Sequence, residues 1–341
     1  MAQRLKTDWL LFSTVVAMVG FGLVMIYSAS SVVAELNPKI QSSFYFLTRQ
    51  FGWAVVSFLL LMFFKKLDYR VLQSPRWAFG GLGVVLILQI VVLILDSKAH
   101  RWFHLHGMTV QPSEFAKPAL LIFLAWFVTL KQENINTRRN LIAACLPLAV
   151  LAATVGFGDL GTAIVLIAPV AIVFFVAGLQ RKFVAAAAVA MLLFSIAAIA
   201  QKPYRIARVI GFFDPEYKWI SIIDTGGKMK KYANESLTTR DAGYQAHQSR
   251  IAIGSGGVAG LGLMQGKQKL FYLPEAHTDF IYAVVGEELG LFGCIAVLAG
   301  FLIILWRGLQ VCWVALDDFG RYLALGVTSS IVVQALINMS V

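Results

Sequence analysis

The sequence predicts an all-α polytopic membrane protein. Of its 341 residues, 59% are hydrophobic and only 14% are charged, and the mean hydropathy is +0.75. A soluble domain has about 45–50% apolar and about 25% charged residues, so both fractions depart from a soluble composition in the same direction. In addition, apolar runs of about 20 residues, the length of one helical crossing, recur along the chain. These observations exclude a soluble enzyme that is held by a single anchor.

Nine apolar runs predict nine transmembrane helices, and a short segment separates each from the next except between the seventh and the eighth. The first run carries the small residues Ser28, Ala29 and Ser30, as a signal peptide does near its cleavage site. Its apolar stretch is longer than the roughly 7–15 residues of a signal peptide, so we expect it to be retained. The nine runs cover residues 9–29, 45–64, 77–95, 112–130, 140–156, 160–178, 183–200, 280–306 and 319–339.

The placement of basic residues predicts a cytoplasmic N-terminus. In that orientation 13 Lys and Arg residues lie in the inner segments and 4 lie in the short outer loops. The opposite orientation would reverse this asymmetry and break the positive-inside rule. The net charge of +11 is therefore largely an orientation signal, and no nucleic-acid partner is expected. The three cysteines, Cys145, Cys294 and Cys312, lie in or beside apolar runs and provide no disulfide framework.

We expect residues 1–341 to form a single membrane domain, with residues 201–278 as one large extracytoplasmic loop between the seventh and eighth spans. Loops longer than about 12–15 residues are usually functional or disordered. Residues 218–242 are polar and charged, which predicts a solvated excursion. Residues 243–275 carry seven glycines among apolar residues, which predicts tightly turning backbone at the membrane surface. Close helix packing or plain flexibility is the alternative explanation for the glycines.

Three ionisable residues gather where this loop meets the eighth span, namely Glu275, His277 and Asp279. Asp279 can cap the helix that follows, or it can act as a general base at a membrane-embedded cleft. His277 can do the same work as a base or form a hydrogen bond at the membrane interface. Glu287 and Glu288 lie about two turns deeper, where ionisable groups are costly and suggest a function. The alternative for both glutamates is a buried partnership with a neighbouring helix.

A second polar group opens the fourth span. Glu114 and Lys117 lie three residues apart on one helix face and can pair. Pro118 cannot donate a hydrogen bond to the Glu114 carbonyl, so we expect a kink and an outward-facing polar pocket. Just ahead, Arg101 belongs to a short basic stretch that suits a phosphate or pyrophosphate group. Asp159, between the fifth and sixth spans, is either a helix N-cap or a further cavity residue.

These groups all lie on the outer side of the predicted topology, where they could converge on one lipid-linked substrate. The motifs resemble those of the SEDS family (shape, elongation, division and sporulation), which includes RodA and FtsW, over nearly the whole chain. The resemblance rests on Arg101-Trp102, Gln111-Pro-Ser-Glu-Phe-Ala-Lys117, Asp159-Leu-Gly-Thr162, Phe213-Asp-Pro215, Tyr244-Gln245, the stretch IAIGSGG at residues 251–257, LPEAHTDFI at residues 273–281 and GEELG at residues 286–290.

The resemblance implies a peptidoglycan glycosyltransferase that polymerises lipid II on the outer face of the bacterial cytoplasmic (inner) membrane. It assigns the essential carboxylate to Asp279, which would deprotonate the sugar hydroxyl that attacks the anomeric carbon of the growing glycan strand. This attack would expel undecaprenyl diphosphate and invert the configuration of the anomeric carbon. Arg101 would suit the diphosphate, and a divalent cation such as Mg²⁺ or Mn²⁺ is expected near Glu114 and Asp279. The remaining cavity residues would be Gln111, Lys117, Asp159, Tyr244, Gln245, His277, Glu287 and Glu288.

Ala276 and Gly286 favour the FtsW division branch, which acts at the septum, over the RodA elongation branch. The resemblance also implies a complex with a class B penicillin-binding protein and with other divisome or elongasome membrane proteins. Members typically have ten spans, so we expect the chain to lack the final outer loop and the tenth helix. Phe157-Gly158 stands where the family often has Gln-Pro, and residues 218–242 resemble an insertion.

Two other classes of function remain as alternatives. A lipid II flippase or transporter would also need many spans and buried charges, although transporters place their substrates near the midplane rather than at one face. A non-catalytic scaffold of a cell-wall synthesis complex is the second alternative.

Overall fold

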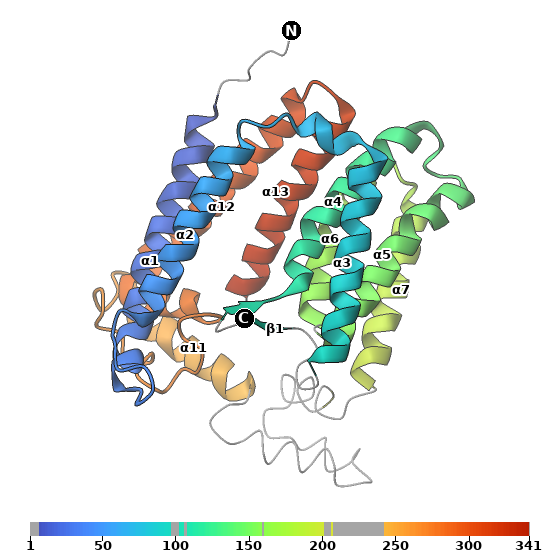
Figure 1. Ribbon diagram of the computed structural model, residues 1–341. Helices are drawn as coiled ribbons and strands as arrows, with labels where there is room; N and C mark the ends of the chain where they lie inside the picture. The colour runs from blue at the N-terminus through green and yellow to red at the C-terminus, as the bar shows by residue number, and fades with distance from the viewer. Residues whose placement is uncertain are drawn as a thin grey trace, which may run out of the picture. The chain divides into compact units, whose positions relative to one another are not determined.

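The computed structural model describes residues 7–96, 102–105, 108–158, 160–200, 206 and 242–340 (Figure 1). Arg101, Asp159 and almost all of the predicted excursion at residues 218–242 lie outside these ranges. The described elements are α1 (Trp9–Leu36), α2 (Tyr45–Phe64), the 3-10 helix η1 (Tyr69–Gln73), α3 (Pro75–Leu95), β1 (Phe103–Leu105), β2 (Met108–Val110), α4 (Pro112–Lys131), the 3-10 helix η2 (Gln132–Asn134), α5 (Arg138–Gly158), α6 (Leu160–Val176), α7 (Arg181–Ala200), α11 (Ala242–Gly256), α12 (Ile281–Val314) and α13 (Asp318–Met339).

All nine predicted spans fall on helices, namely α1 to α7, α12 and α13. Seven of the described helices are long and apolar enough to cross a membrane, and α6 is a shorter apolar helix. The helix α2 has no buried residue, so its apolar surface is free to face lipid. The predicted class of fold is therefore confirmed, and the number of nine crossings stays a prediction.

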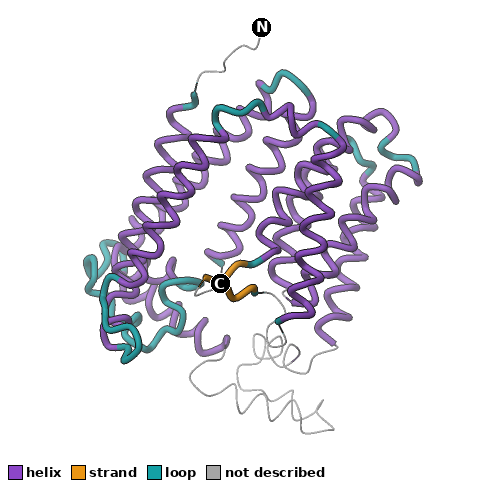
Figure 2. The backbone as a smooth tube through the Cα atoms, in the orientation of Figure 1, coloured by secondary structure: helices purple, strands orange, loops and turns teal. Residues whose placement is uncertain are grey.

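Three local features differ from the sequence prediction. The strands β1 and β2 form a small antiparallel hairpin, with Phe103 opposite Val110, in a chain expected to be all-α (Figure 2). Strands of three residues are too short for an alternating pattern to reveal them. Residues 242–256 form the regular helix α11 instead of turning backbone, so the turns begin only at Gly257. The helix α12 also runs beyond the predicted end of the eighth span.

The chain divides into two compact units. Unit 1 comprises residues 1–62, 190–300 and 338–341, and unit 2 comprises residues 63–189 and 301–337. In unit 1, Met25 and Ala29 of α1 form a buried apolar cluster with Ala252 of α11 and with Phe280 and Val284 at the start of α12. In unit 2 the core consists mainly of residues from α3, α4, α5, α6 and α13, and α3 packs along α4.

A polar contact in unit 2 fixes the start of α13. Asp317 Oδ1 accepts the backbone N–H of Gly320 at 2.6 Å, which caps the helix. Its other oxygen, Oδ2, accepts the Tyr69 hydroxyl at 2.7 Å and Arg70 Nε at 3.2 Å. Asp317 therefore connects η1 with the turn between α12 and α13.

Candidate active site

Asp279 lies on a turn that is held by its buried neighbours. The side chains of Leu273, Ala276 and Phe280 are 3%, 5% and 6% exposed and pack in the cluster of unit 1, whereas Asp279 is exposed. The Phe280 carbonyl accepts the N–H groups of Ala283 and Val284, so Phe280 and not Asp279 begins the hydrogen bonding of α12. Among the described residues, the Asp279 carboxylate accepts no hydrogen bond. The structure thus does not show the capping role that the sequence allowed for Asp279.

His277 lies two residues before Asp279 and packs against an aromatic side chain. Its ring centroid is 4.4 Å from that of Phe46 of α2, at an interplanar angle of 49°. Burial lowers the pKa of His277 below its ordinary value, and the negative charges of Glu275 and Asp279 offset only part of that effect. The imidazole is therefore neutral at pH 7, and it can donate or accept a hydrogen bond beside Asp279.

The glycine-rich segment after α11 packs its backbone directly on α12. Gly290 has φ 64° and ψ −158°, which interrupts the helical geometry of α12. A Cβ atom on Gly260 would lie 2.2 Å from the Glu288 carbonyl oxygen, and Gly260 itself has φ +81°. The Glu287 and Glu288 carbonyls accept N–H groups from Leu261 and Gly262 at 3.0 and 2.9 Å. Close packing, rather than plain flexibility, accounts for Gly260 and Gly290.

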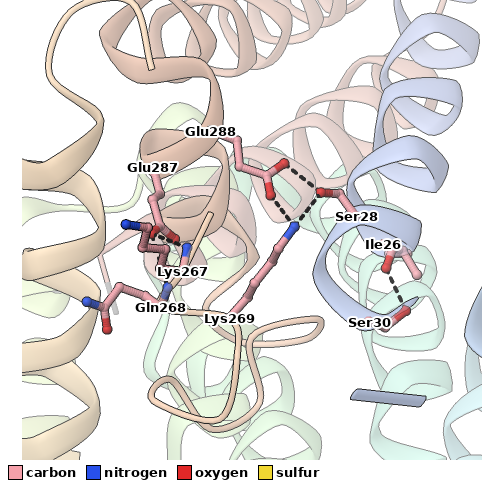
Figure 3. Close-up of polar contacts among 8 residues, drawn as sticks. All are labelled: Ile26, Ser28, Ser30, Lys267, Gln268, Lys269, Glu287 and Glu288. Atoms are coloured by element: carbon pink, nitrogen blue, oxygen red, sulfur yellow. Dashed lines mark hydrogen bonds and ion pairs between the residues drawn. The ribbon is translucent and has the colours of Figure 1, made fainter. Parts of the chain in front are cut away.

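Glu288 is held in a buried polar cluster formed by three elements. Its carboxylate accepts hydrogen bonds from Ser28 Oγ of α1, at 2.6 Å, and from Lys269 Nζ of the loop that precedes α12 (Figure 3). Lys269 Nζ also donates to Ser28 Oγ at 3.1 Å. The exposed fractions of Ser28, Lys269 and Glu288 are 1%, 3% and 0%. We call these three residues the clasp.

Glu287 is also buried, at 1% exposure, and it binds backbone instead of side chains. Its Oε1 accepts the N–H groups of Lys267 and Gln268 at 2.7 and 3.0 Å. Its Oε2 has no hydrogen-bond partner within the described part of the chain and lies beside Gly266. Glu287 and Glu288 thus have the buried partnerships that the sequence left open. A direct contact of either side chain with substrate stays a prediction.

The predicted pair at the start of α4 is present in unit 2. Lys117 Nζ donates to both carboxylate oxygens of Glu114, at 2.7 and 2.8 Å, and to Gln334 Oε1 of α13 at 2.9 Å. Lys117 is buried and Glu114 is exposed. The helix α4 continues through Pro118, which cannot donate a backbone hydrogen bond, and the kink and outward-facing pocket stay predictions.

The remaining candidates lie on defined elements or outside the described ranges. Gln111 is half-buried at the N-cap position of α4, without a side-chain hydrogen bond to that helix, and Tyr244 and Gln245 are half-buried on α11. Arg101 and Asp159 are not among the described residues. The structure brings Glu287 and Glu288 into one buried region and pairs Glu114 with Lys117.

The two predicted ligands, Asp279 and Glu114, differ in how well they could bind a divalent cation. The free carboxylate of Asp279 suits a hard cation, whereas both oxygens of Glu114 accept hydrogen bonds from Lys117. Within the described ranges, no group of three or more His, Cys, Asp or Glu residues could hold a metal ion. A cation shared by Glu114 and Asp279 stays a prediction.

Sequence reasoning did not find Ser28, Lys269 and Gln334. Lys269 belongs to the short polar run Gln265–Lys269, which is typical of a solvated loop. Ser28 resembles any small residue of a spanning helix. The signal that could have identified Ser28 and Lys269 is the need of Glu288 for donors, because a buried carboxylate must be paired or hydrogen-bonded.

Long apolar helices joined by short connections define a multi-pass membrane protein. The chain belongs to the family of cell cycle proteins that comprises FtsW, RodA and SpoVE, which it matches over residues 8–341. It is 38% identical to the probable peptidoglycan glycosyltransferase FtsW of Trichlorobacter lovleyi, over 98% of this chain and 83% of that protein. It is 32% identical to the stage V sporulation protein E of Bacillus subtilis, over 99% of this chain and 88% of that protein.

Solved structures share this fold. A chain of a peptidoglycan synthase complex that coordinates polymerization and crosslinking superimposes with a TM-score of 0.72 at 23% identity, over 98% of this chain and 87% of that chain. The rod shape determining protein RodA of Thermus thermophilus superimposes with a TM-score of 0.63 at 22% identity, over 98% and 85%. The predicted resemblance to the SEDS family is therefore confirmed, with relatives of the FtsW type among the matches.

Proposed function

We propose that the chain is a peptidoglycan glycosyltransferase that polymerises lipid II into glycan strands for cell division or cell elongation. The main support for this function is the match over residues 8–341 to the family, in which similar relatives are named probable peptidoglycan glycosyltransferases. The relatives of the FtsW type favour the division role, and hence the bacterial inner membrane at the division septum. The peptidoglycan synthase complex with the same fold supports a partner of the penicillin-binding class.

Asp279 is the residue to which we assign the general base. Its carboxylate is exposed and accepts no hydrogen bond from the described residues, so its lone pairs are available to a substrate hydroxyl. In the proposed step, Asp279 takes the proton of the sugar hydroxyl of the incoming lipid II. The hydroxyl oxygen forms a bond to the anomeric carbon of the growing strand, and the bond from that carbon to undecaprenyl diphosphate breaks. Attack from the opposite face inverts the carbon and gives a β-linkage.

Several other residues complete the proposal. Neutral His277 can hydrogen-bond a sugar hydroxyl beside Asp279, and Arg101 would attract the diphosphate. A divalent cation such as Mg²⁺ or Mn²⁺ would stabilise the charge of the leaving diphosphate, with Asp279 as one available oxygen ligand. Polymerisation in the presence of EDTA, and after each cation is restored, tests this part of the proposal.

The variant Asp279→Asn tests the general base. We expect it to lower the rate of polymer formation from lipid II at least 100-fold, because an amide cannot take the proton and a general base contributes about 10²–10⁴-fold. The measurement is the length and amount of glycan made by the full chain in complex with its penicillin-binding partner. Glu275→Gln removes an exposed carboxylate from the same turn, and we expect it to retain activity.

Unchanged polymerisation by Asp279→Asn at normal thermal stability would exclude the general-base role. An Asp279→Asn protein that makes no polymer and still moves labelled lipid II across vesicles would support the transporter alternative. Loss of activity in Asp279→Asn and Glu275→Gln alike would indicate an effect of charge on the turn instead of a specific base.

A further inference from the structure

The loop that carries Asp279 is attached to α1 by polar contacts and by apolar contacts on the same helix face. Met25, Ser28 and Ala29 are spaced three and four residues apart, so they lie along one side of α1. Met25 and Ala29 pack in the apolar cluster with Phe280, and Ser28 binds Lys269 and Glu288. One strip of α1 therefore contacts the loop on both sides of Asp279.

The clasp joins α1 to two segments that lie far from it in the sequence. Lys269 is 241 residues from Ser28, and Ser28 is 260 residues from Glu288. Because the hydrogen bonds run between all three pairs, the clasp fixes both the direction and the spacing of the loop relative to α1 and α12 (Figure 3).

A buried charged cluster of this kind is a poor source of net stability. The removal of both ions from water costs several kcal/mol for each, which the ion pair recovers only when its geometry is good. Replacement of such a pair by apolar residues of similar volume is often neutral or stabilising. The directional hydrogen bonds of the clasp distinguish it from an apolar contact, because they specify one arrangement of the loop.

The connection from the clasp to Asp279 is short and firmly held. The Leu273 N–H donates to the Gln268 carbonyl at 2.8 Å, which closes a turn immediately around Lys269. Leu273 and Ala276 are buried, and the Phe280 N–H reaches back to the Glu275 carbonyl at 3.4 Å. A displacement of Lys269 would therefore be transmitted to the turn on which Asp279 is exposed.

We propose that Ser28, Lys269 and Glu288 are positioning residues that hold the Asp279 turn in the geometry needed for proton transfer. This inference rests on the proposed glycosyltransferase function for its catalytic consequence. In this role Glu288 and Lys269 act through Asp279, because the Glu288 carboxylate already binds Ser28 and Lys269. A misplacement of about 1 Å at a catalytic group can cost on the order of 100-fold in rate, so a small shift of the turn is sufficient.

A spin label at Thr278 measures the position of the turn independently of activity. Thr278 is exposed beside Asp279, and Cys145, Cys294 and Cys312 are first replaced so that Thr278→Cys is the single labelled site. In full-length protein in nanodiscs, we expect Ser28→Ala and Lys269→Met to narrow the EPR spectrum, because the label becomes more mobile. Two controls of the same residue types are Ser30→Ala, whose hydroxyl bonds only to the Ile26 carbonyl among the described residues, and Lys267→Met at an exposed lysine.

The double variant Lys269→Met/Glu288→Met separates positioning from stability. It leaves no unpaired buried charge, so we expect the apparent Tm to remain near that of the wild type. With the clasp absent, we expect the label at Thr278 to stay mobile and polymerisation to fall at least roughly tenfold.

Recovery of wild-type EPR spectra and polymerisation in the double variant would overturn the proposal, because the clasp would then be only structural. An unchanged spectrum in Ser28→Ala and Lys269→Met would overturn it as well. Failure of the glycosyltransferase function is a distinct result. It would appear as a wild-type complex that makes no glycan from lipid II, while the EPR spectra would still report whether the clasp holds the turn.

Discussion

Asp279 and Glu288 are close in sequence, and their surroundings give the two carboxylates different roles. Asp279 is exposed and accepts no hydrogen bond from the described residues, whereas Glu288 is 0% exposed and accepts hydrogen bonds from Lys269 and Ser28. A carboxylate that is fully occupied by fixed donors cannot readily take a substrate proton, and an exposed one can. The sequence placed Asp279 at the mouth of the eighth span and Glu288 about two turns deeper, and only the contacts show what each carboxylate meets.

Asp317 shows a third environment for a carboxylate. Burial by itself raises its pKa, and hydrogen bonds from Tyr69, Gly320 and Arg70 outweigh that effect, so the pKa of Asp317 lies below its ordinary value. The ionised form is therefore favoured in the folded state. Its contribution to stability is present above the unfolded pKa of about 3.9 and is lost as the pH falls through the lower folded pKa.

We expect Asp317→Ala to lower the apparent Tm at pH 7 by about 2–4 °C, since loss of an N-cap costs about 1 kcal/mol. Asp317→Asn keeps an acceptor for the Gly320 N–H but loses the charge and the second oxygen, which binds Tyr69 and Arg70, so its effect should be smaller than that of Asp317→Ala. Thermal unfolding at pH 7 and at about pH 3 provides the measurement. A difference between wild type and Asp317→Asn that does not shrink at the lower pH would contradict the assigned role of the charge.

At the scale of elements, α12 shows how glycine positions allow a loop and a helix to exchange backbone hydrogen bonds. The carbonyls of Glu287 and Glu288 bind the segment after α11, and the Leu291 N–H donates to the Gly257 carbonyl at 3.1 Å. This exchange requires the left-handed backbone at Gly290 and Gly260. The glycine run was visible in the sequence, but its docking partner was not, because glycine has no side chain to reveal what it packs against.

Gly260→Ala tests this docking. Both the positive φ and the approach of a Cβ atom to the Glu288 carbonyl oppose the substitution, so we expect a loss of about 1–3 kcal/mol in stability. Gly254→Ala is the matched control, because a Cβ atom there meets nothing within 4 Å and alanine favours the helix α11. The measurement is the free energy of unfolding in detergent. Equal stability of the two variants would argue against tight backbone docking at Gly260.

At the scale of the molecule, the length of α1 bears on the predicted membrane topology. Ser28 is the member of the clasp that belongs to α1. It lies 19 residues after Trp9, where the helix begins, which corresponds to about 28 Å along the helix axis. This is close to the thickness of a hydrocarbon core of about 30 Å, so the loop and the segment before α1 lie at opposite ends of a spanning helix. The basic residues predict that the N-terminus lies in the cytoplasm and the Asp279 turn outside.

Cysteine accessibility in intact spheroplasts tests the orientation. In a chain without native cysteines, we expect a membrane-impermeant maleimide to label Thr278→Cys and to leave Thr7→Cys unlabelled, because only the outer side is accessible. Both sites should react after permeabilisation, which serves as the control for exposure. Labelling of Thr7→Cys alone in intact spheroplasts would require the opposite topology.

The sequence by itself determined the class of fold, the position of every predicted helix, the family and the candidate base Asp279. These features depend on hydropathy and on local motifs, which residues close together in the chain encode. The tertiary structure decided that the Phe280 carbonyl rather than Asp279 begins the hydrogen bonding of α12, that Lys269 is buried, and that Glu288 binds Ser28. Such contacts join residues up to 260 positions apart, and no local pattern specifies which donor a buried carboxylate meets.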